Sequence, residues 1–260
     1  MRLELIAQLP SSPSQRTPLL FVHGGWHAAW CWEHFLPWFA ARGHAAYALS
    51  LRGHGASDGR AGQRWHRVAD YVEDLRWAVD RLPSAPVIVG HSMGGYVAQK
   101  YLEAHAAPGA VLMASIPPHG LYRFAARLAL RHPALFLMSH LRLDARHVVG
   151  TPALVREAFF SASTPEETVL ACHRRLTGAS FRIELDALFA ALPDPARITV
   201  PMLVLAARGD RLFSVAEQRR TARAYGTEAE EFDMGHDMML EPGWEQVAAR
   251  ILEWMSARGL

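Results

Sequence analysis

The 260-residue sequence has few cysteines, a single lysine and almost no net charge. Its two cysteines, Cys31 and Cys172, are too few for a disulfide framework, and we expect both to be buried thiols. The formal charge is only +2, from 27 lysines and arginines against 25 acidic residues, and Lys100 is the only lysine. This near balance leaves no basic footprint, so we expect no nucleic-acid partner.

Long uncharged apolar runs are also missing. The first six residues include an arginine and a glutamate and lack the apolar core of a secretory signal peptide. The most apolar later stretch, residues 121–143, is interrupted by four arginines, whereas a membrane helix needs about 20 nearly uncharged residues. We therefore expect no integral membrane segment, and a cytoplasmic location.

The first part of the chain alternates short apolar runs with longer helical patterns. Half of the residues are apolar and 20% are charged, which excludes a disordered chain. Strands are predicted at 19–22, 45–49, 86–90 and 111–114, with helices at 30–41, 68–79 and 95–104. Pro37 should break or kink the first of these helices. Strands alternating with helices in this way predict an α/β fold with a mostly parallel, doubly wound sheet.

From Pro117 onward the rhythm changes, and about eighty residues are predicted to be almost entirely helical. Thr151-Pro152 and Thr164-Pro165 each indicate a helix start with an N-cap threonine. Strands and helices then alternate again, at 201–206, 215–225, 230–232 and 244–256. We therefore expect residues 1–116 and 196–260 to form one α/β core, with residues 117–195 inserted into it as a helical cap.

The sharpest motif is Gly90-His91-Ser92-Met93-Gly94, a G-x-S-x-G between a predicted strand and a predicted helix. A nucleophile on such a strained turn needs glycines two residues to either side, where side chains would collide. The turn lifts the serine hydroxyl above the sheet and directs the following helix N-terminus at it. The alternative is a tight turn with an unreactive serine.

A serine hydroxyl needs a base, and the base needs an orienting acid. Asp210 follows one predicted strand and His236 follows the next. The order serine, aspartate, histidine is the one expected for a nucleophile on this kind of turn. We therefore predict Ser92, Asp210 and His236 as catalytic residues. Asp233 and Asp237 are rival acids, but they lie too close to His236 in sequence to approach it from another strand end.

Other histidines have simpler interpretations. His91 neighbours Ser92 but should point away along the turn and pack. His23 and His54 lie in glycine-rich turns, where we favour structural hydrogen bonds over catalysis. No set of histidines, cysteines and acids has convincing metal-ligand spacing, so we expect neither a metal nor a cofactor.

The turn His23-Gly24-Gly25-Trp26 is predicted to supply half of an oxyanion hole. A tetrahedral intermediate places negative charge on an oxygen that two backbone N–H groups must already face. The N–H groups of Gly25 and Met93 are the candidates. Three tryptophans near this turn are predicted to be core residues, or less readily walls of a pocket: Trp26, Trp30 and Trp32.

Five segments together resemble the α/β-hydrolase superfamily: His23-Gly24-Gly25, Leu51-Arg52-Gly53-His54-Gly55-Ala56-Ser57, Gly90-His91-Ser92-Met93-Gly94-Gly95, Gly209-Asp210 and Gly235-His236. The resemblance extends over residues 19–255. It implies an acyl hydrolase similar to bacterial carboxylesterases and monoacylglycerol-lipase-like enzymes, and residues 22–32 also resemble plant methylesterases and hydroxynitrile lyases. Trp26 stands where the hormone-sensitive-lipase group has a third glycine, which places the chain outside that group.

The resemblance implies a serine hydrolase that cleaves carboxylic esters through an acyl-enzyme. Its substrates are expected to be small-molecule esters with small to medium apolar acyl or aromatic groups, beneath an apolar cap that sets chain-length preference. The same residues could instead serve a non-hydrolytic C–C or C–CN lyase or a thioesterase, and less readily a ligand-sensing protein. Fold alone does not choose among these activities.

Overall fold

A seven-stranded sheet forms the centre of the structure, a computed structural model that describes residues 1–260. Its strand order is β1-β3-β2-β4-β5-β6-β7, and only β1 runs antiparallel to its neighbour. The strands are β1 (Glu4–Gln8), β2 (Leu19–Val22), β3 (Ala46–Ser50), β4 (Val87–His91), β5 (Ala110–Met113), β6 (Met202–Ala207) and β7 (Ala229–Phe232). The predicted fold class, an α/β fold with a mostly parallel doubly wound sheet, is confirmed.

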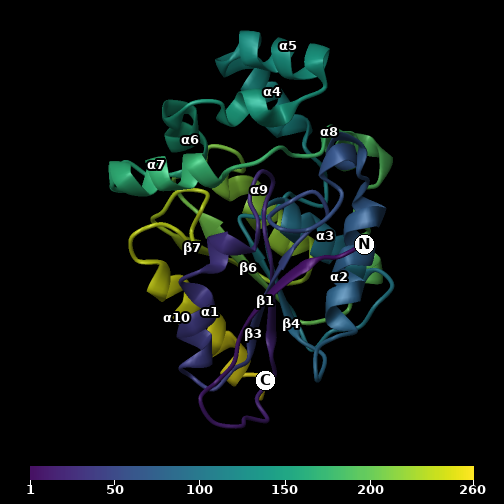
Figure 1. The fold of residues 1–260 in the computed structure, drawn as a ribbon, viewed down its shortest axis with the longest axis vertical. Coiled ribbons are helices and arrows are strands. Elements are labelled where there is room, and N and C mark those ends of the chain that lie inside the picture. The colour runs from purple at the N-terminus through teal and green to yellow at the C-terminus, as the bar shows by residue number, and fades with distance from the viewer.

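Helices cover both faces of this sheet. Figure 1 shows α1 and α10 on one face and α2 and α3 on the other. The helices of this layer are α1 (Phe35–Ala40), α2 (Val68–Val79), α3 (Met93–Leu102), α9 (Val215–Ala224) and α10 (Trp244–Ser256). None of the helices in the molecule combines the length and apolarity that crossing a bilayer requires.

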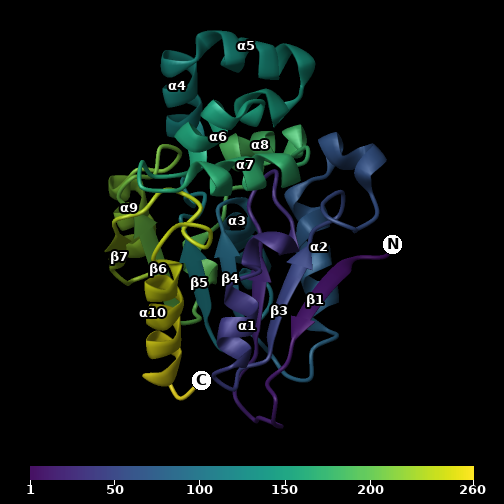
Figure 2. The same ribbon diagram turned by 60° about the vertical axis from the view of Figure 1, so that its left-hand side comes forward.

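Between β5 and β6 the chain forms only helices. Figure 2 shows them gathered over one end of the sheet, with α6, α7 and α8 nearest to it and α4 and α5 farther out. They are α4 (Tyr122–Arg131), α5 (Pro133–Arg142), α6 (Pro152–Phe159), α7 (Glu166–Arg175) and α8 (Phe181–Leu185), followed by a π-helical turn over Asp186–Ala190. Short 3₁₀ segments elsewhere in the chain span Ala29–Trp32, Arg60–Trp65, Ala145–Val149 and Pro195–Arg197.

The aromatic cluster between β2 and α1 is the densest part of the core. Phe21 is fully buried, and its ring lies 4.9–5.9 Å from those of Trp32, Phe35 and Phe39. Phe21 lies in the buried strand β2, and the other three rings lie in the helical segment that follows it and pack against that strand. Trp32 is therefore a core residue, as the sequence predicts.

Three local predictions need correction. Strand β1 was not predicted; its outer half is exposed, which leaves too few apolar positions to signal a strand. The helix predicted over 30–41 divides into a 3₁₀ turn and α1, and Pro37 is accommodated in the first turn of α1. Helix α7 begins at Glu166 after Pro165, without a side-chain cap from Thr164. The other predicted cap is confirmed, because the Thr151 hydroxyl accepts from the Leu154 N–H.

Candidate active site

Ser92 occupies a left-handed turn between β4 and α3, with φ 51° and ψ −116°. A non-glycine residue in such a conformation is strained, and here its backbone is held on both sides. Its N–H donates to the Met113 carbonyl at 3.1 Å, and its carbonyl accepts from the N–H groups of Gly95, Tyr96 and Ile116. The turn is therefore fixed by the neighbouring strand and by the helix that it starts.

The glycines around Ser92 are required because other backbone lies against them. A Cβ on Gly90 would lie 2.6 Å from the Gly94 carbonyl oxygen and from the Gly95 Cα. A Cβ on Gly94 would lie 2.6 Å from the His23 carbonyl oxygen. Any side chain at these positions would push α3 away from β4 and from the turn after β2.

The structure brings Asp210 and His236 together from two different loops. The Nδ1 of His236 and the Oδ2 of Asp210 are 2.8 Å apart, and both side chains are buried. The other carboxylate oxygen of Asp210 accepts the N–H groups of Leu212 and Phe213, at 2.7 and 3.0 Å. Three hydrogen bonds therefore fix the carboxylate, which leaves the imidazole held in one orientation.

His91 links the loop of His236 to the turn of Ser92. Its Nε2–H donates to the His236 carbonyl oxygen at 3.0 Å, and the two rings lie 4.7 Å apart. Burial lowers the pKa of His91 to about 3, so its ring is neutral. The His236 side chain has a hydrogen bond to Asp210 and none to the Ser92 hydroxyl in this structure.

Neither rival acid forms a hydrogen bond or ion pair with the His236 ring, although an Asp237 carboxylate oxygen lies within 4.8 Å of a ring nitrogen. Asp233 is exposed. Asp237 is fully buried, and its Oδ2 lies 2.9 Å from the Nε2 of His27. Burial by itself would raise the pKa of Asp237, but the charge and hydrogen bond of His27 lower it below its usual value. Asp237 therefore forms a buried ion pair behind the His236 loop, which the sequence did not reveal.

Two backbone N–H groups beside Ser92 have no acceptor in the chain. They belong to Gly25 and Met93, the residues predicted to form an oxyanion hole. Trp26, next to Gly25, is itself left-handed at φ 65°, with its indole N–H donating to the Ala145 carbonyl at 3.2 Å. Gly25 and Trp26 both line the cavity that adjoins Ser92.

Two histidines of the glycine-rich turns form structural hydrogen bonds. The ring of His23 donates to the Gly24 carbonyl at 2.8 Å and accepts from the Leu51 N–H at 3.0 Å. His54 donates to the His27 carbonyl at 2.8 Å, and burial lowers the pKa of His54 to about 4. Both interpretations made from the sequence agree with these contacts.

A cluster that contains Cys172 joins α7 to the loop that carries His27. Cys172 lies 3.8 Å from the His27 Nε2, and both cysteines of the chain are buried, as expected. Cys172, His27 and Asp237 have ligand atoms close enough to hold an ion, a grouping that sequence spacing did not indicate. The donor set is a poor fit, because Asp237 already uses the His27 Nε2 and burial raises the pKa of the Cys172 thiol.

A small, mostly apolar cavity of about 50 Å³ adjoins Ser92, and we name it the serine cavity. Its lining comes from the sheet-edge loops and from the helices above them, and includes Gly25, Met93, Leu121, Phe124, Ile183 and Glu184. A second cavity of about 20 Å³, the roof cavity, lies between the helices and shares Trp26, Leu121, Phe124 and Glu184 with the first. Trp26 is therefore a wall of both cavities.

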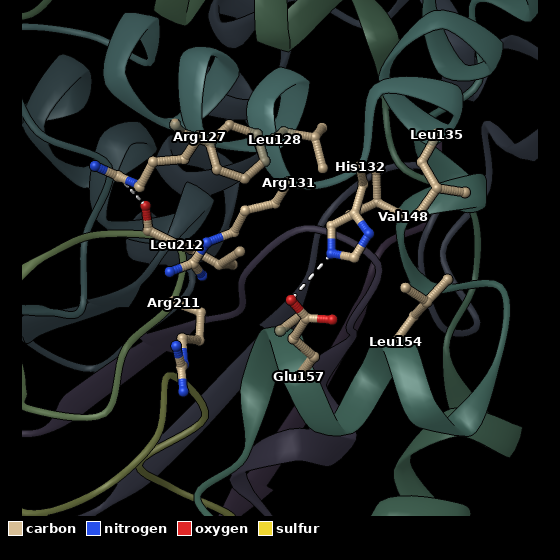
Figure 3. A pocket seen from close by; sticks show the side chains of 12 residues that line it. Arg127, Leu128, Arg131, His132, Leu135, Val148, Leu154, Glu157, Arg211 and Leu212 are labelled. Carbon is tan, nitrogen blue, oxygen red and sulfur yellow. Dashed lines mark hydrogen bonds and ion pairs between the residues drawn. The ribbon is translucent and has the colours of Figure 1, made fainter.

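A third cavity of about 50 Å³, the outer cavity, lies between α4, α6 and the loop after Asp210. Figure 3 shows Arg127 directed at the Leu212 carbonyl oxygen, with which it forms a hydrogen bond. On the opposite side of this cavity, His132 and Glu157 form a hydrogen bond of 3.0 Å. Phe124 lines all three cavities and so separates them from one another.

Comparison with known proteins gives one family for almost the entire chain. Residues 19–250 match the profile described as the alpha/beta hydrolase family. A rice protein named "Probable esterase PIR7A" (Oryza sativa subsp. indica) is 31% identical over 172 residues, covering 58% of this chain and 63% of that protein. Methylesterase 10 of Arabidopsis thaliana is 34% identical over 105 residues, which is 38% of either chain. The chain thus spans less than two thirds of the length of these relatives.

Among solved structures, an esterase from Exiguobacterium antarcticum has a TM-score of 0.74 at 20% identity. The superposition covers 98% of this chain and 94% of the esterase. At this identity the likeness concerns the fold, which is shared over the whole length of both proteins.

The buried pair of Asp237 and His27 should contribute stability over a limited pH range. Burial alone would lower the pKa of His27, but the Asp237 carboxylate raises it well above its usual value. The pair therefore stabilises the fold fully between about pH 4 and 6.5, the unfolded-state pKa values of the two groups. Its contribution is lost as the pH falls through the lowered pKa of Asp237, or rises through the raised pKa of His27.

We predict that Asp237→Asn lowers the free energy of unfolding by about 3 kcal/mol near pH 5.5, and by less at pH 9. Urea unfolding at both pH values measures this difference. The exposed Asp233→Asn is the matched control and should stay within about 0.5 kcal/mol of the wild type. An equal loss for Asp237→Asn at both pH values would contradict the ion pair.

Proposed function

The chain belongs to the alpha/beta hydrolase family, and on this premise we propose that it is a serine carboxylic ester hydrolase. In this proposal Ser92 is the nucleophile, His236 the general base and Asp210 the acid that orients it. The names of the rice and Arabidopsis relatives support an ester substrate. Residues 1–116 and 196–260 would be the catalytic core, and residues 117–195 the cap over it.

The observation that carries the proposal is the convergence of three features at the serine cavity. Ser92 is held there in a strained turn. Two backbone N–H groups without an acceptor line the same cavity. The hydrogen bond from His91 to the His236 carbonyl connects the His236–Asp210 pair to the Ser92 turn. A nucleophile, an oriented base and paired oxyanion donors are the three parts that acyl transfer needs.

In the first half-reaction, His236 removes the Ser92 proton as the hydroxyl oxygen attacks the ester carbonyl. Because its Nδ1 is bonded to Asp210, the ring presents its other nitrogen to the serine, and the carboxylate stabilises the imidazolium that forms. The alcohol then leaves with the proton from His236. In the reacting complex, the Ser92 hydroxyl would donate a hydrogen bond to the free ring nitrogen of His236.

The negative charge of the tetrahedral intermediate falls on the former carbonyl oxygen. The N–H groups of Gly25 and Met93 would bind this oxygen, and neither would first have to give up a hydrogen bond within the chain. Such donors are more effective than water because they need no reorganisation during the reaction. Water activated by His236 then hydrolyses the acyl-enzyme and releases the acid.

The serine cavity favours short or compact acyl groups. At about 50 Å³ it holds a few water-sized groups, and most of its lining is apolar. Phe124 closes the cavity toward the roof and outer cavities. Longer or aromatic acyl groups would require Phe124, and the helix α4 that carries it, to shift.

Ser92→Ala should abolish activity, because no other side chain in the serine cavity has both the strained turn and an adjacent base. A panel of p-nitrophenyl esters from acetate to octanoate is expected to show a loss of about 10⁵–10⁶-fold in kcat. A fluorophosphonate probe should label the wild type at Ser92 and leave the variant unlabelled. Labelling that persists in Ser92→Ala would exclude this residue as the nucleophile.

Asp210→Asn should lower kcat by about 10³–10⁴-fold while the protein stays folded. An amide keeps the shape of the carboxylate, but it favours the wrong imidazole tautomer and cannot stabilise the imidazolium. Asp233→Asn is the control, because Asp233 is exposed and distant from the ring, and its kcat should be unchanged. If Asp233→Asn instead caused the large loss, the acid would have to be reassigned.

Phe124→Ala should broaden the acyl-chain range by joining the serine, roof and outer cavities. The ratio of kcat/KM for p-nitrophenyl octanoate to that for the acetate is expected to rise by at least about tenfold. Leu130→Ala lies on the same helix but is 84% exposed, so it serves as the control. An unchanged ratio in Phe124→Ala would mean that acyl chains do not extend beneath α4.

A further inference from the structure

Glu184, on α8, places an unpaired carboxyl group at the junction of the serine and roof cavities. It lines both of them, and its carboxyl forms no hydrogen bond or ion pair with the rest of the chain. Burial, with no compensating partner, raises the pKa of Glu184 to about 8. The group is therefore a neutral carboxylic acid near pH 7, able both to donate and to accept a hydrogen bond.

Ser139, on α5, is a second polar group of the same kind. Its side chain is 3% exposed, it lines the roof cavity, and its hydroxyl has no hydrogen-bond partner. Buried polar groups in folded proteins are nearly always paired, so the unpaired Ser139 hydroxyl, beside a partly buried Glu184 carboxyl that also has no partner, calls for an explanation.

Three other polar side chains around these cavities already have hydrogen-bond partners. The Ser180 hydroxyl donates to the His66 carbonyl at 2.6 Å, and the Trp26 indole donates to the Ala145 carbonyl at 3.2 Å. His140 donates from Nδ1 to the carbonyl of Phe136 at 2.8 Å. Glu184 and Ser139 are thus left to pair with something that enters from the serine cavity.

The size of the roof cavity limits what that group can be. A volume of about 20 Å³ accommodates about one water-sized group, which suits a hydroxyl. A hydroxyl can accept from one of the two side chains and donate to the other. A neutral carboxylic acid in an apolar site also favours an uncharged guest over an ammonium group, which would require it to ionise.

We propose that Glu184 and Ser139 form a recognition site for a hydroxyl group on the substrate, such as a hydroxyalkyl ester carries. The hydroxyl would lie in the roof cavity while the ester carbonyl lies at Ser92. The position of the ester rests on the proposed hydrolase function, whereas the hydroxyl site rests on the cavity alone. Glu184 and Ser139 act on specificity and take no part in bond breaking.

Pairs of esters that differ only by a hydroxyl group test this site. In one set the hydroxyl lies on the acyl part of the ester, and in the other on the alcohol part. The first set compares methyl propanoate with methyl 3-hydroxypropanoate, and the second compares ethyl and propyl acetate with 2-hydroxyethyl and 3-hydroxypropyl acetate. The wild type should prefer at least one hydroxylated ester by about tenfold or more in kcat/KM. Glu184→Leu should bring the kcat/KM ratio of hydroxylated to plain ester close to one, whereas Glu184→Gln, which still donates and accepts, should retain most of the preference. Ser139→Ala should show an intermediate loss.

Binding separates this proposal from the proposed hydrolase function. Propanamide and 3-hydroxypropanamide can be titrated calorimetrically into Ser92→Ala, with and without Glu184→Leu. A preference for a hydroxylated amide that depends on Glu184 supports the site even if no ester is hydrolysed. Equal binding and equal turnover for all members would overturn it and leave the cavity as a water site. A preference for an aminomethyl analogue, lost in Glu184→Gln, would replace the hydroxyl site by a cation site.

Discussion

The left-handed conformation of Ser92 is the constraint on which the rest of the site depends. It costs about 1–3 kcal/mol and persists only because surrounding structure imposes it. The carbonyl of Ser92 accepts three backbone N–H groups, and its N–H bonds to β5. The same turn requires α3 to approach β4 at Gly90 and β2 at Gly94, so that Cβ atoms have no room there. The close approach of α3 leaves the first N–H of that helix, from Met93, facing the cavity.

Hydrogen bonds from buried neutral histidines hold the Ser92 turn and the other loops at the sheet edge together. His23, His54 and His91 each donate one ring N–H to a backbone carbonyl, of Gly24, His27 and His236. An imidazole can do this in a dry interior because burial keeps it uncharged. The loops of His27 and His236 are thereby held by side chains from other parts of the chain, those of His54 and His91. The separation between the Ser92 turn and the His236 loop consequently depends on His91.

Much of the fold and the candidate site could be predicted from local sequence. The strand–turn–helix around Ser92 was predictable because glycine spacing and apolar runs are local signals, and the same holds for α2 and α10. The pairing of His27 with Asp237 was not predictable, since the two residues are joined only by the packing of two distant loops. Glu184 and Ser139 were missed for a related reason. On a helix pattern each reads as a surface residue, and only the packing of the helices over the sheet encloses them.

The helices above the sheet are attached to the loops that carry the candidate site residues as well as lying over them. Arg127 of α4 bonds to the Leu212 carbonyl and pairs with Glu217 at 2.8 Å, so α4 is tied to the loop whose N–H groups hold Asp210. Thr177, just after α7, donates its N–H to the Trp26 carbonyl at 2.8 Å, beside Gly25. A displacement of these helices would therefore move the loop that carries Asp210 and the turn that carries Gly25 together. A substrate large enough to move α4 would alter the geometry of the groups that act on it, so the fit beneath the helices bears on turnover as well as on binding.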